Sequence, residues 1–164
     1  PGNPTGVVLE PDGLKAIAEV CRRRGVLLIS DEIYRAFHFD GTPRSAAEFD
    51  PDVLVVEGFG KTYGVTGWRL GFSHGPAAII EEMTKLQQFT YVCAPSALQA
   101  GAIAAMDFDV SGIVADYRAK RDAIVAGLGE RFEFAKSGGA FYLFPKAPWG
   151  TGSEFVAAAI RENL

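Results

Sequence analysis

Hydrophobic and polar positions along the chain predict helices that alternate with short apolar strands. Between residues 11 and 24, apolar side chains recur at helical spacing, at Leu14, Ile17, Ala18 and Cys21. Pro11 is a typical first helical residue, and three arginines followed by Gly25 are a typical helix end. Two continuous apolar runs, 26–29 and 53–56, have the composition of strands that are covered on both faces, as in a parallel sheet.

The glycine-rich stretch after the second run predicts an antiparallel return. A third strand is expected at 69–73, after a link of about ten residues, whereas a parallel return usually needs a dozen or more. We therefore expect one antiparallel pair within a mostly parallel sheet. Helical patterns follow, then short strands and an amphipathic closing helix. The expected helices are 76–89, 95–106, 110–130 and 153–164, and the expected short strands lie near 131–134 and 140–145.

The pattern changes near Asp107–Asp109. Before this point apolar strands alternate with helices, and after it come one long helix and an α+β tail. We predict an α/β fold in which residues 1–108 belong to a mostly parallel mixed sheet with flanking helices. Residues 109–164 would begin a small α+β domain. The chain opens at Pro1 in a cluster of turn residues, and its closing helix lacks a stop signal, so we expect an internal fragment of a longer protein.

Composition narrows the classes of protein. Of the 164 residues 48% are hydrophobic and 22% are charged, which is typical of a globular domain. The net charge of −4 provides no basic surface for nucleic acid or an anionic membrane, and no apolar run approaches the roughly 18 residues of a membrane span. Cys21 and Cys93 are isolated, so we expect neither a disulfide nor a metal site, and we expect a reducing, cytoplasmic environment.

Lys61 is the first candidate for chemistry, because it lies in a glycine-rich loop. The triplet Gly60-Lys61-Thr62 resembles part of a phosphate-binding loop, but that motif needs a glycine where Val55 stands. Asp31 follows the 26–29 run, at the strand end where open α/β sheets bind ligands. Taken alone, a loop lysine is usually a solvated charge, and an aspartate after a strand is usually a turn former.

Three further residues are ordinary when each is considered alone. Asn3 lies between turn residues, Tyr34 could be a core aromatic with an exposed hydroxyl, and Arg69 could be a surface charge. Their order along the chain with Asp31 and Lys61 is what distinguishes them.

Four segments in this order resemble the class I/II aminotransferases of pyridoxal-phosphate (PLP) fold type I. They are Pro1-Gly-Asn-Pro-Thr-Gly6, Ser30-Asp-Glu-Ile-Tyr34, Gly60-Lys61-Thr62 and Gly67-Trp-Arg-Leu-Gly71. The resemblance covers nearly the whole chain, and Ser137-Gly-Gly-Ala-Phe-Tyr142 is similar to a strand of the family's small domain. It implies that residues 1–108 are the C-terminal part of the large PLP-binding domain and that 109–164 begin the small domain.

The resemblance assigns roles to five residues. Lys61 would form the Schiff base with PLP and move the proton during catalysis. Asp31 would pair with the pyridine nitrogen, and Tyr34 and Asn3 would hydrogen-bond the phenolic oxygen of the cofactor. Arg69 would bind the phosphate through its planar guanidinium.

The sequence departs from the family at two glycines. The family often has serine at the positions of Gly58 and Gly60, and the first serine usually donates to the phosphate. Gly58 has no hydroxyl, so backbone amides or Thr62 would have to replace it. Glycine before the lysine also occurs in relatives similar to the kynurenine, glutamine and methionine aminotransferases.

By resemblance, the parent protein exchanges an amino group between an amino acid and a 2-oxo acid and acts as a homodimer with a shared active site. Two alternatives remain open: a carbon–sulfur lyase with the same cofactor residues, and the sensing domain of a transcriptional regulator. A degenerate, non-catalytic domain is disfavoured because Lys61, Asp31 and Arg69 are all present.

Overall fold

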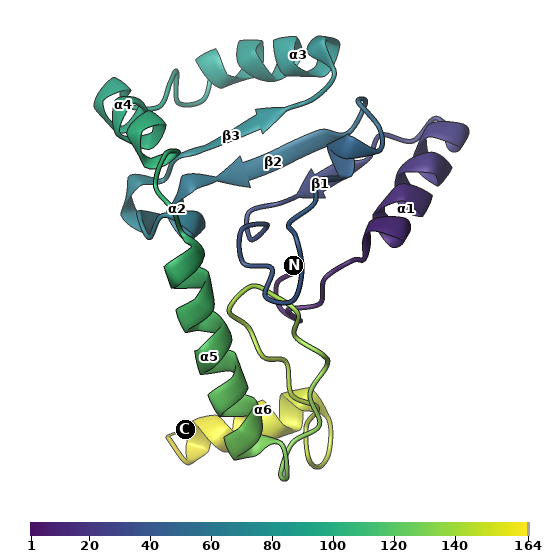
Figure 1. Ribbon diagram of the computed structural model, residues 1–164, viewed down its shortest axis with the longest axis vertical. Coiled ribbons are helices and arrows are strands. Elements are labelled where there is room, and N and C mark those ends of the chain that lie inside the picture. The colour runs from purple at the N-terminus through teal and green to yellow at the C-terminus, as the bar shows by residue number, and fades with distance from the viewer. Residues whose placement is uncertain (164) are drawn as a thin grey trace.

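The computed structural model describes residues 1–163 and contains a three-stranded sheet (Figure 1). The strands are β1 (Ile29–Asp31), β2 (Leu54–Gly58) and β3 (Gly71–His74), in the order β1-β2-β3. β1 pairs with β2 in parallel, and β2 pairs with β3 antiparallel, with Val56 opposite Ser73. The predicted antiparallel return is thus confirmed, and the link between the two strands holds only short helical turns at residues 59–62 and 66–68.

Helices surround the sheet and extend away from it (Figure 1). The first helix has the bounds that the sequence predicts, and Gly25 ends it in a left-handed conformation with φ 62°. The three helical patterns after the sheet are also confirmed within two residues at each end. The helices are α1 (Pro11–Arg24), α2 (Phe59–Thr62), α3 (Ala77–Gln88), α4 (Ser96–Ala105), α5 (Ser111–Leu128) and α6 (Gly152–Arg161), with short 3-10 turns η1 (Ala46–Glu48) and η2 (Thr66–Trp68).

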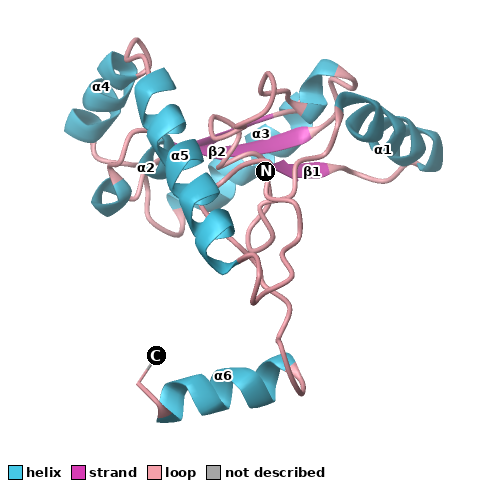
Figure 2. Cartoon of the chain, turned by 60° about the horizontal axis from the view of Figure 1, so that its bottom comes forward, coloured by secondary structure: helices cyan, strands magenta, loops and turns pink. Residues whose placement is uncertain are grey.

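The closing helix α6 lies far from the sheet, beyond the loops that follow α5 (Figures 1 and 2). Thr151 caps its first turn, since its hydroxyl accepts from the backbone N–H of Glu154 at 3.3 Å. The ring of Phe155 packs edge-on against Phe132 and Trp149, with centroids 6.2 Å and 5.6 Å away. These aromatic contacts attach α6 to the preceding loops.

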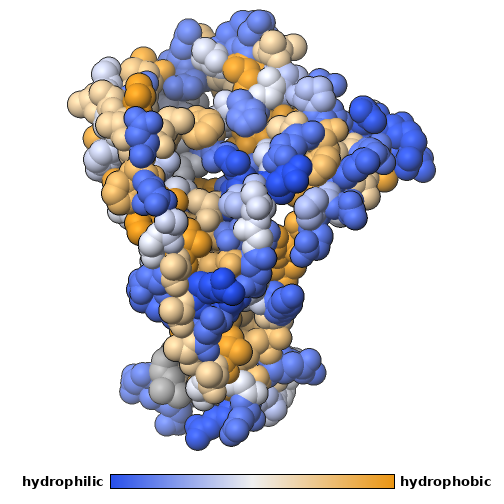
Figure 3. Space-filling model, viewed as in Figure 1, coloured by the Kyte–Doolittle hydropathy of each residue, from blue (hydrophilic) through white to orange (hydrophobic). Residues whose placement is uncertain are grey.

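The apolar core is small and lies beneath α1 and η1. Ala46, Val53 and Val55 are buried there, with Leu14 and Leu28 packed against them. Many large apolar side chains elsewhere reach the surface, and Figure 3 shows orange residues mixed with blue ones across the molecule. No helix in residues 1–163 is both long and apolar enough to cross a membrane.

The expectation of a doubly covered strand at 26–29 was wrong. The strand begins only at Ile29, and Val26, Leu27 and Ile29 are 58%, 45% and 59% exposed. Residues 29–31 pair with β2 along one edge, and among the described residues no strand pairs with the other edge of β1. Residues 26–28 instead form the connection from the helix end at Gly25.

The strands expected near 131–134 and 140–145 were also wrong. Only an isolated bridge between Phe134 and Pro145 forms in this region. Ala140 has a left-handed φ of 55°, which interrupts an extended strand, and Pro145 has no N–H to donate to a ladder. The segment finds its partners far away in sequence, because His38 and Gly139 form a second isolated bridge.

Three distant segments meet in what we call the glycine junction, formed by Gly6, Phe37–Phe39 and Gly138–Ala140. The carbonyl of Gly6 accepts from the N–H groups of Gly138 and Gly139 at 3.0 and 3.1 Å. Phe39 N–H donates to Gly138 at 2.8 Å, and Ala140 N–H donates to Phe37 at 2.9 Å. Gly6 has φ 68°, and a Cβ there would lie 2.9 Å from the carbonyl oxygen of Tyr142. A side chain therefore cannot fit at Gly6 without separating these segments.

We expect Gly6→Ala to lower the free energy of unfolding by about 2 kcal/mol, because it combines a left-handed alanine with a backbone clash. Gly13→Ala is the matched control, since nothing lies within 4 Å of a Cβ at that helical position. Chemical denaturation of the intact protein measures both. Equal stability of the two variants would contradict the role of the junction.

Candidate active site

Asp31 ends β1 and caps the turn that follows. The backbone N–H of Ile33 donates to its Oδ1 at 3.2 Å, while the carboxylate remains exposed. The turn-forming role considered from the sequence is therefore present. It leaves the carboxylate accessible at the carboxyl end of the strand, which is where a ligand of such a sheet binds.

Tyr34, three residues further on, is 6% exposed and connects to two distant segments. Its hydroxyl lies 2.5 Å from the hydroxyl of Tyr142, and the amide nitrogen of Asn3 donates to Tyr142 at 3.3 Å. The ring of Tyr34 also stands edge-on to Phe141 and Tyr142, at centroid distances of 5.1 and 5.4 Å. Asn3 and Tyr34, both predicted from the sequence, therefore lie on either side of Tyr142.

Burial, together with the hydrogen bond to Tyr142, raises the pKa of Tyr34 to about 12. The nearby charge of Asp31 acts in the same direction, whereas the amide of Asn3 lowers this pKa. The phenol of Tyr34 therefore keeps its proton at neutral pH and can act as a hydrogen-bond donor.

Lys61 lies on α2, directly after β2, and is half-buried. Its Nζ is 5.7 Å from the centroid of the Phe141 ring. Gly60 lets α2 approach η2 closely, because a Cβ there would lie 3.2 Å from the Cα of Thr66. Phe141 and Tyr142 thus contact Asn3, Tyr34 and Lys61, and bring these three predicted residues together.

Arg69 lies apart from this cluster. It has a left-handed φ of 51°, it is exposed, and its Nη1 donates to the carbonyl of Thr66 at 3.3 Å. Within residues 1–163 it makes no hydrogen bond or ion pair with Asn3, Asp31, Tyr34 or Lys61. The flanking Gly71 is required by packing, because a Cβ there would lie 2.6 Å from the carbonyl oxygen of Glu57.

The position of Gly58 is restricted by its neighbour Ile33. A Cβ at Gly58 would lie 3.2 Å from Cδ1 of Ile33, so a serine would require this side chain to shift. The glycine at position 58 is therefore matched by the packing of a side chain from the turn after β1.

A charged cluster that the sequence did not reveal holds this turn in place. Glu32 is 8% exposed, and its Oε1 accepts from the hydroxyls of Ser30 and Ser45 and from the N–H of Ala46, each at 2.9 Å. Nη2 of Arg35 then binds Glu57 of β2 at 2.5 Å. The turn that carries Asp31 and Tyr34 is thereby tied to the strand that leads to Lys61.

The contact between Glu32 and Arg35 is electrostatic. Oε2 of Glu32 lies 3.3 Å from Nε of Arg35, which is ion-pair range, yet both atoms are buried without a hydrogen-bond partner among the described residues. The distance shows that the two charges attract, and the missing hydrogen bond shows that the angle between the groups is unfavourable.

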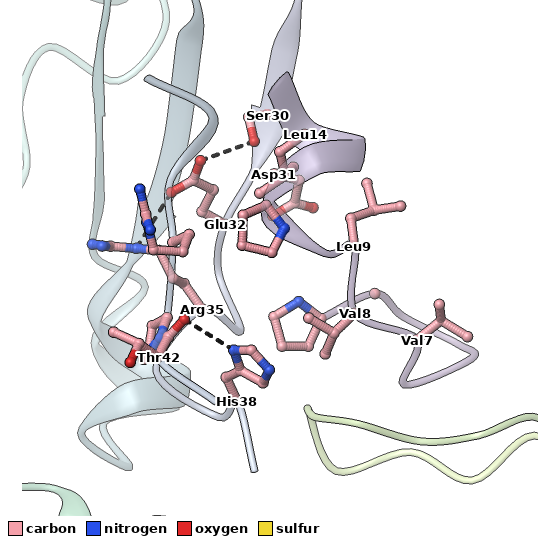
Figure 4. A pocket seen from close by; sticks show the side chains of 15 residues that line it. Val7, Val8, Leu9, Leu14, Ser30, Asp31, Glu32, Arg35, His38 and Thr42 are labelled. Atoms are coloured by element: carbon pink, nitrogen blue, oxygen red, sulfur yellow. Dashed lines mark hydrogen bonds and ion pairs between the residues drawn. The ribbon is translucent and has the colours of Figure 1, made fainter. Parts of the chain in front are cut away.

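A pocket of about 200 Å³ lies beside this cluster, and Figure 4 shows Asp31, Glu32 and His38 on its walls. Neither Tyr34 nor Lys61 lines it. We place the candidate site at the contacts of Phe141 and Tyr142, because the side chains with suitable chemistry meet there. The sequence had marked the segment 137–142 only as a strand of the small domain, and so it missed Phe141 and Tyr142 as site residues.

Comparison with known proteins identifies the family of the chain. Residues 1–163 match the family described as Aminotransferase class I and II. The chain belongs to this family. It is 34% identical, over 99% of its length, to a probable aspartate aminotransferase of Methanocaldococcus jannaschii, and 39% identical, over 88%, to an aspartate aminotransferase of Sulfurisphaera tokodaii. It covers 46% and 38% of these two proteins, so this aminotransferase chain spans less than half the length of the curated relatives it matches.

Solved aminotransferase structures share its fold. The aromatic aminotransferase from Pyrococcus horikoshii OT3 superposes on 99% of the chain with a TM-score of 0.93 at 33% identity. An aspartate aminotransferase from Thermotoga maritima gives a TM-score of 0.92 at 28% identity, also over 99% of the chain. The chain covers 47% and 44% of those two structures. The expected fold, a mixed α/β sheet of PLP fold type I, is confirmed.

The contact with Tyr142 contributes to the raised pKa of Tyr34, and this contribution can be measured. We expect Tyr142→Phe to lower the pKa of Tyr34 from about 12 while leaving it above the ordinary value near 10, since burial remains. Carbon-13 NMR of labelled tyrosine in the cofactor-free intact protein measures the change. Because the folded state holds this proton more tightly, its contribution to stability is complete below pH 10 and is lost as the pH rises towards 12. An unchanged pKa in the variant would contradict the contact.

Proposed function

We propose that the intact protein is a PLP-dependent aminotransferase that moves an amino group between an amino acid and a 2-oxo acid. The observation that carries this proposal is the meeting of Asn3, Tyr34 and Lys61 at Phe141 and Tyr142, in a chain of the class I and II family. Relatives are named as aspartate, aromatic-amino-acid and N-acetyl-LL-diaminopimelate aminotransferases. They share one reaction and differ in the amino acid, so the proposal concerns the reaction class.

The side chains present fit PLP chemically. Among the described residues Lys61 forms no salt bridge, so its amine is free for covalent bonding to an aldehyde. The exposed carboxylate of Asp31 suits a protonated pyridine nitrogen, and the protonated phenol of Tyr34 suits a phenolate oxygen. When bound, PLP withdraws electrons from the Cα of the amino acid.

Each of the candidate site residues then has a defined role in the reaction. Lys61 Nζ holds the cofactor and later moves the proton at the substrate Cα. Asp31 keeps a proton on the ring nitrogen, while Tyr34 and Asn3 direct hydrogen-bond donors at the phenolic oxygen. Arg69 is exposed and keeps its guanidinium available for the phosphate, which it would bind through two parallel N–H groups.

The organisation of the intact protein is part of the proposal. We place the boundary between the large and small domains at residues 108 and 109, in the gap between α4 and α5. Oδ1 of Asp109 accepts from the N–H of Ser111 at 2.9 Å and so marks the start of α5. We further propose a cytoplasmic homodimer that shares its active sites and has neither a nucleic-acid nor a membrane partner, as the resemblance and the acidic composition suggest.

Lys61 should carry the cofactor. After borohydride reduction of the holoenzyme, peptide mapping is expected to find the phosphopyridoxyl group on Lys61, because its amine is half-buried at the candidate site. Lys85 and Lys120 serve as internal controls, since both are exposed and paired with acids. A label on either of these instead of Lys61 would refute the assignment.

Asp31→Ala should retain the cofactor but lose turnover by roughly 100-fold or more, since a charge that stabilises the reacting ring is removed while other contacts remain. Asp107→Ala, which changes an exposed acid outside the site, should keep normal turnover. Formation of 2-oxo acid is measured with and without an acceptor 2-oxo acid. Near-normal turnover of Asp31→Ala would refute its role, and product formation without an acceptor would indicate a lyase.

A further inference from the structure

Three polar side chains from three parts of the chain form one hydrogen-bonded series. The amide nitrogen of Asn3 donates to the hydroxyl of Tyr142 at 3.3 Å, and that hydroxyl lies 2.5 Å from the hydroxyl of Tyr34. Tyr142 is the middle member, and the resemblance to the family assigned it no role. Its position determines whether the hydroxyl of Tyr34 accepts or donates in the hydrogen bond between the two phenols.

The direction of the short phenol–phenol hydrogen bond follows from Asn3. An amide N–H can only donate, so it occupies a lone pair on the oxygen of Tyr142. Accepting this bond makes the O–H of Tyr142 a stronger donor, because successive hydrogen bonds polarise one another. The favoured arrangement therefore has Tyr142 donating to Tyr34, which leaves the single proton of Tyr34 free.

We propose that Tyr142 is a positioning residue that accepts from Asn3 and donates to Tyr34, so that the Tyr34 proton is directed at the phenolic oxygen of the cofactor. This inference rests on the proposed function, in which Tyr34 contacts that oxygen. Tyr142 acts through Tyr34 and does not itself touch the cofactor.

The backbone around Tyr142 is fixed well enough to hold this geometry. The hydroxyl of Ser137 donates to the carbonyl of Tyr142 at 3.1 Å, and the glycine junction binds the same segment to Gly6. The ring of Tyr142 packs on Phe141 and Tyr34 with centroids 5.3 and 5.4 Å away. The raised pKa of Tyr34 agrees with a retained proton. The part of that rise due to Tyr142 concerns the ionisation of Tyr34 at high pH, whereas at neutral pH the phenol of Tyr34 is protonated.

The direct test is the pH titration of the visible absorbance of PLP bound to the intact protein. The proton that the chromophore loses lies near its phenolic oxygen, so a donor to that oxygen stabilises the deprotonated form. Tyr34→Phe is therefore expected to raise the titration midpoint. Tyr142→Phe should raise it by roughly half a pH unit or more, the scale of one weakened hydrogen bond, but by less than Tyr34→Phe.

A double-mutant cycle distinguishes positioning from an independent effect. Tyr142→Phe should produce no further shift in a Tyr34→Phe background, because its action passes through the missing hydroxyl. An equal shift in both backgrounds would overturn the proposal. Tyr117→Phe is the matched control, since it removes a hydroxyl from a ring that packs 5.3 Å from Phe141 but is outside the series, and it should leave the midpoint unchanged.

Rescue provides a second variant. Tyr142→4-aminophenylalanine restores a hydrogen-bond donor at the same ring position. It should return the titration midpoint towards the wild-type value. A midpoint that stays at the Tyr142→Phe value would overturn the proposal. A visible band that shifts with Tyr34→Phe but not with Tyr142→Phe would overturn the role of Tyr142 and leave the proposed function intact. A protein without any visible band would overturn both.

Discussion

Four backbone hydrogen bonds among Gly6, Phe37–Phe39 and Gly138–Ala140 hold the candidate site together. They join the loop that carries Asn3, the turn that follows Tyr34 and the segment that carries Tyr142. None of these segments forms a helix or strand at the junction, so backbone groups that a helix or sheet would satisfy pair across the junction instead. The close approach depends on glycine, because a Cβ at Gly6 or Gly139 would overlap neighbouring atoms. The geometry of the site therefore originates in backbone packing.

The charged cluster of Glu32, Arg35 and Glu57 supports the other side of the site. One guanidinium lies between two carboxylates, and one of these is almost fully buried. Such a cluster adds little to net stability, because desolvation offsets the attraction between the charges. Its contribution is to orientation, since it ties the turn after β1 to the end of β2 and keeps Asp31 and Lys61 on connected elements. Removal of Arg35 would leave two carboxylates near one another without their shared counter-charge.

The sequence predicted those features of the fold that depend on residues close together in the chain. The bounds of α1 follow from Pro11 and Gly25, and the return to β3 follows from a link too short for a crossover. The strands expected after residue 130 were wrong because the partners of that segment lie more than a hundred residues earlier, at Gly6 and Phe37. For the same reason the motifs identified Asn3, Tyr34 and Lys61 but missed Tyr142, which contacts Asn3 across 139 positions of the sequence.

The helix α5 has a mechanical consequence for the site. Its 18 residues give a rod of roughly 27 Å, so a tilt of about 10° at one end displaces the other end by about 5 Å. Near its start, Tyr117 packs on Phe37 and Phe141, and Phe141 is the ring that faces Lys61. The aromatic contacts of Tyr117 therefore lie near the point about which such a tilt would turn, beside Lys61. A displacement of several ångströms at the C-terminal end of α5 would therefore correspond to only a fraction of that beside Lys61.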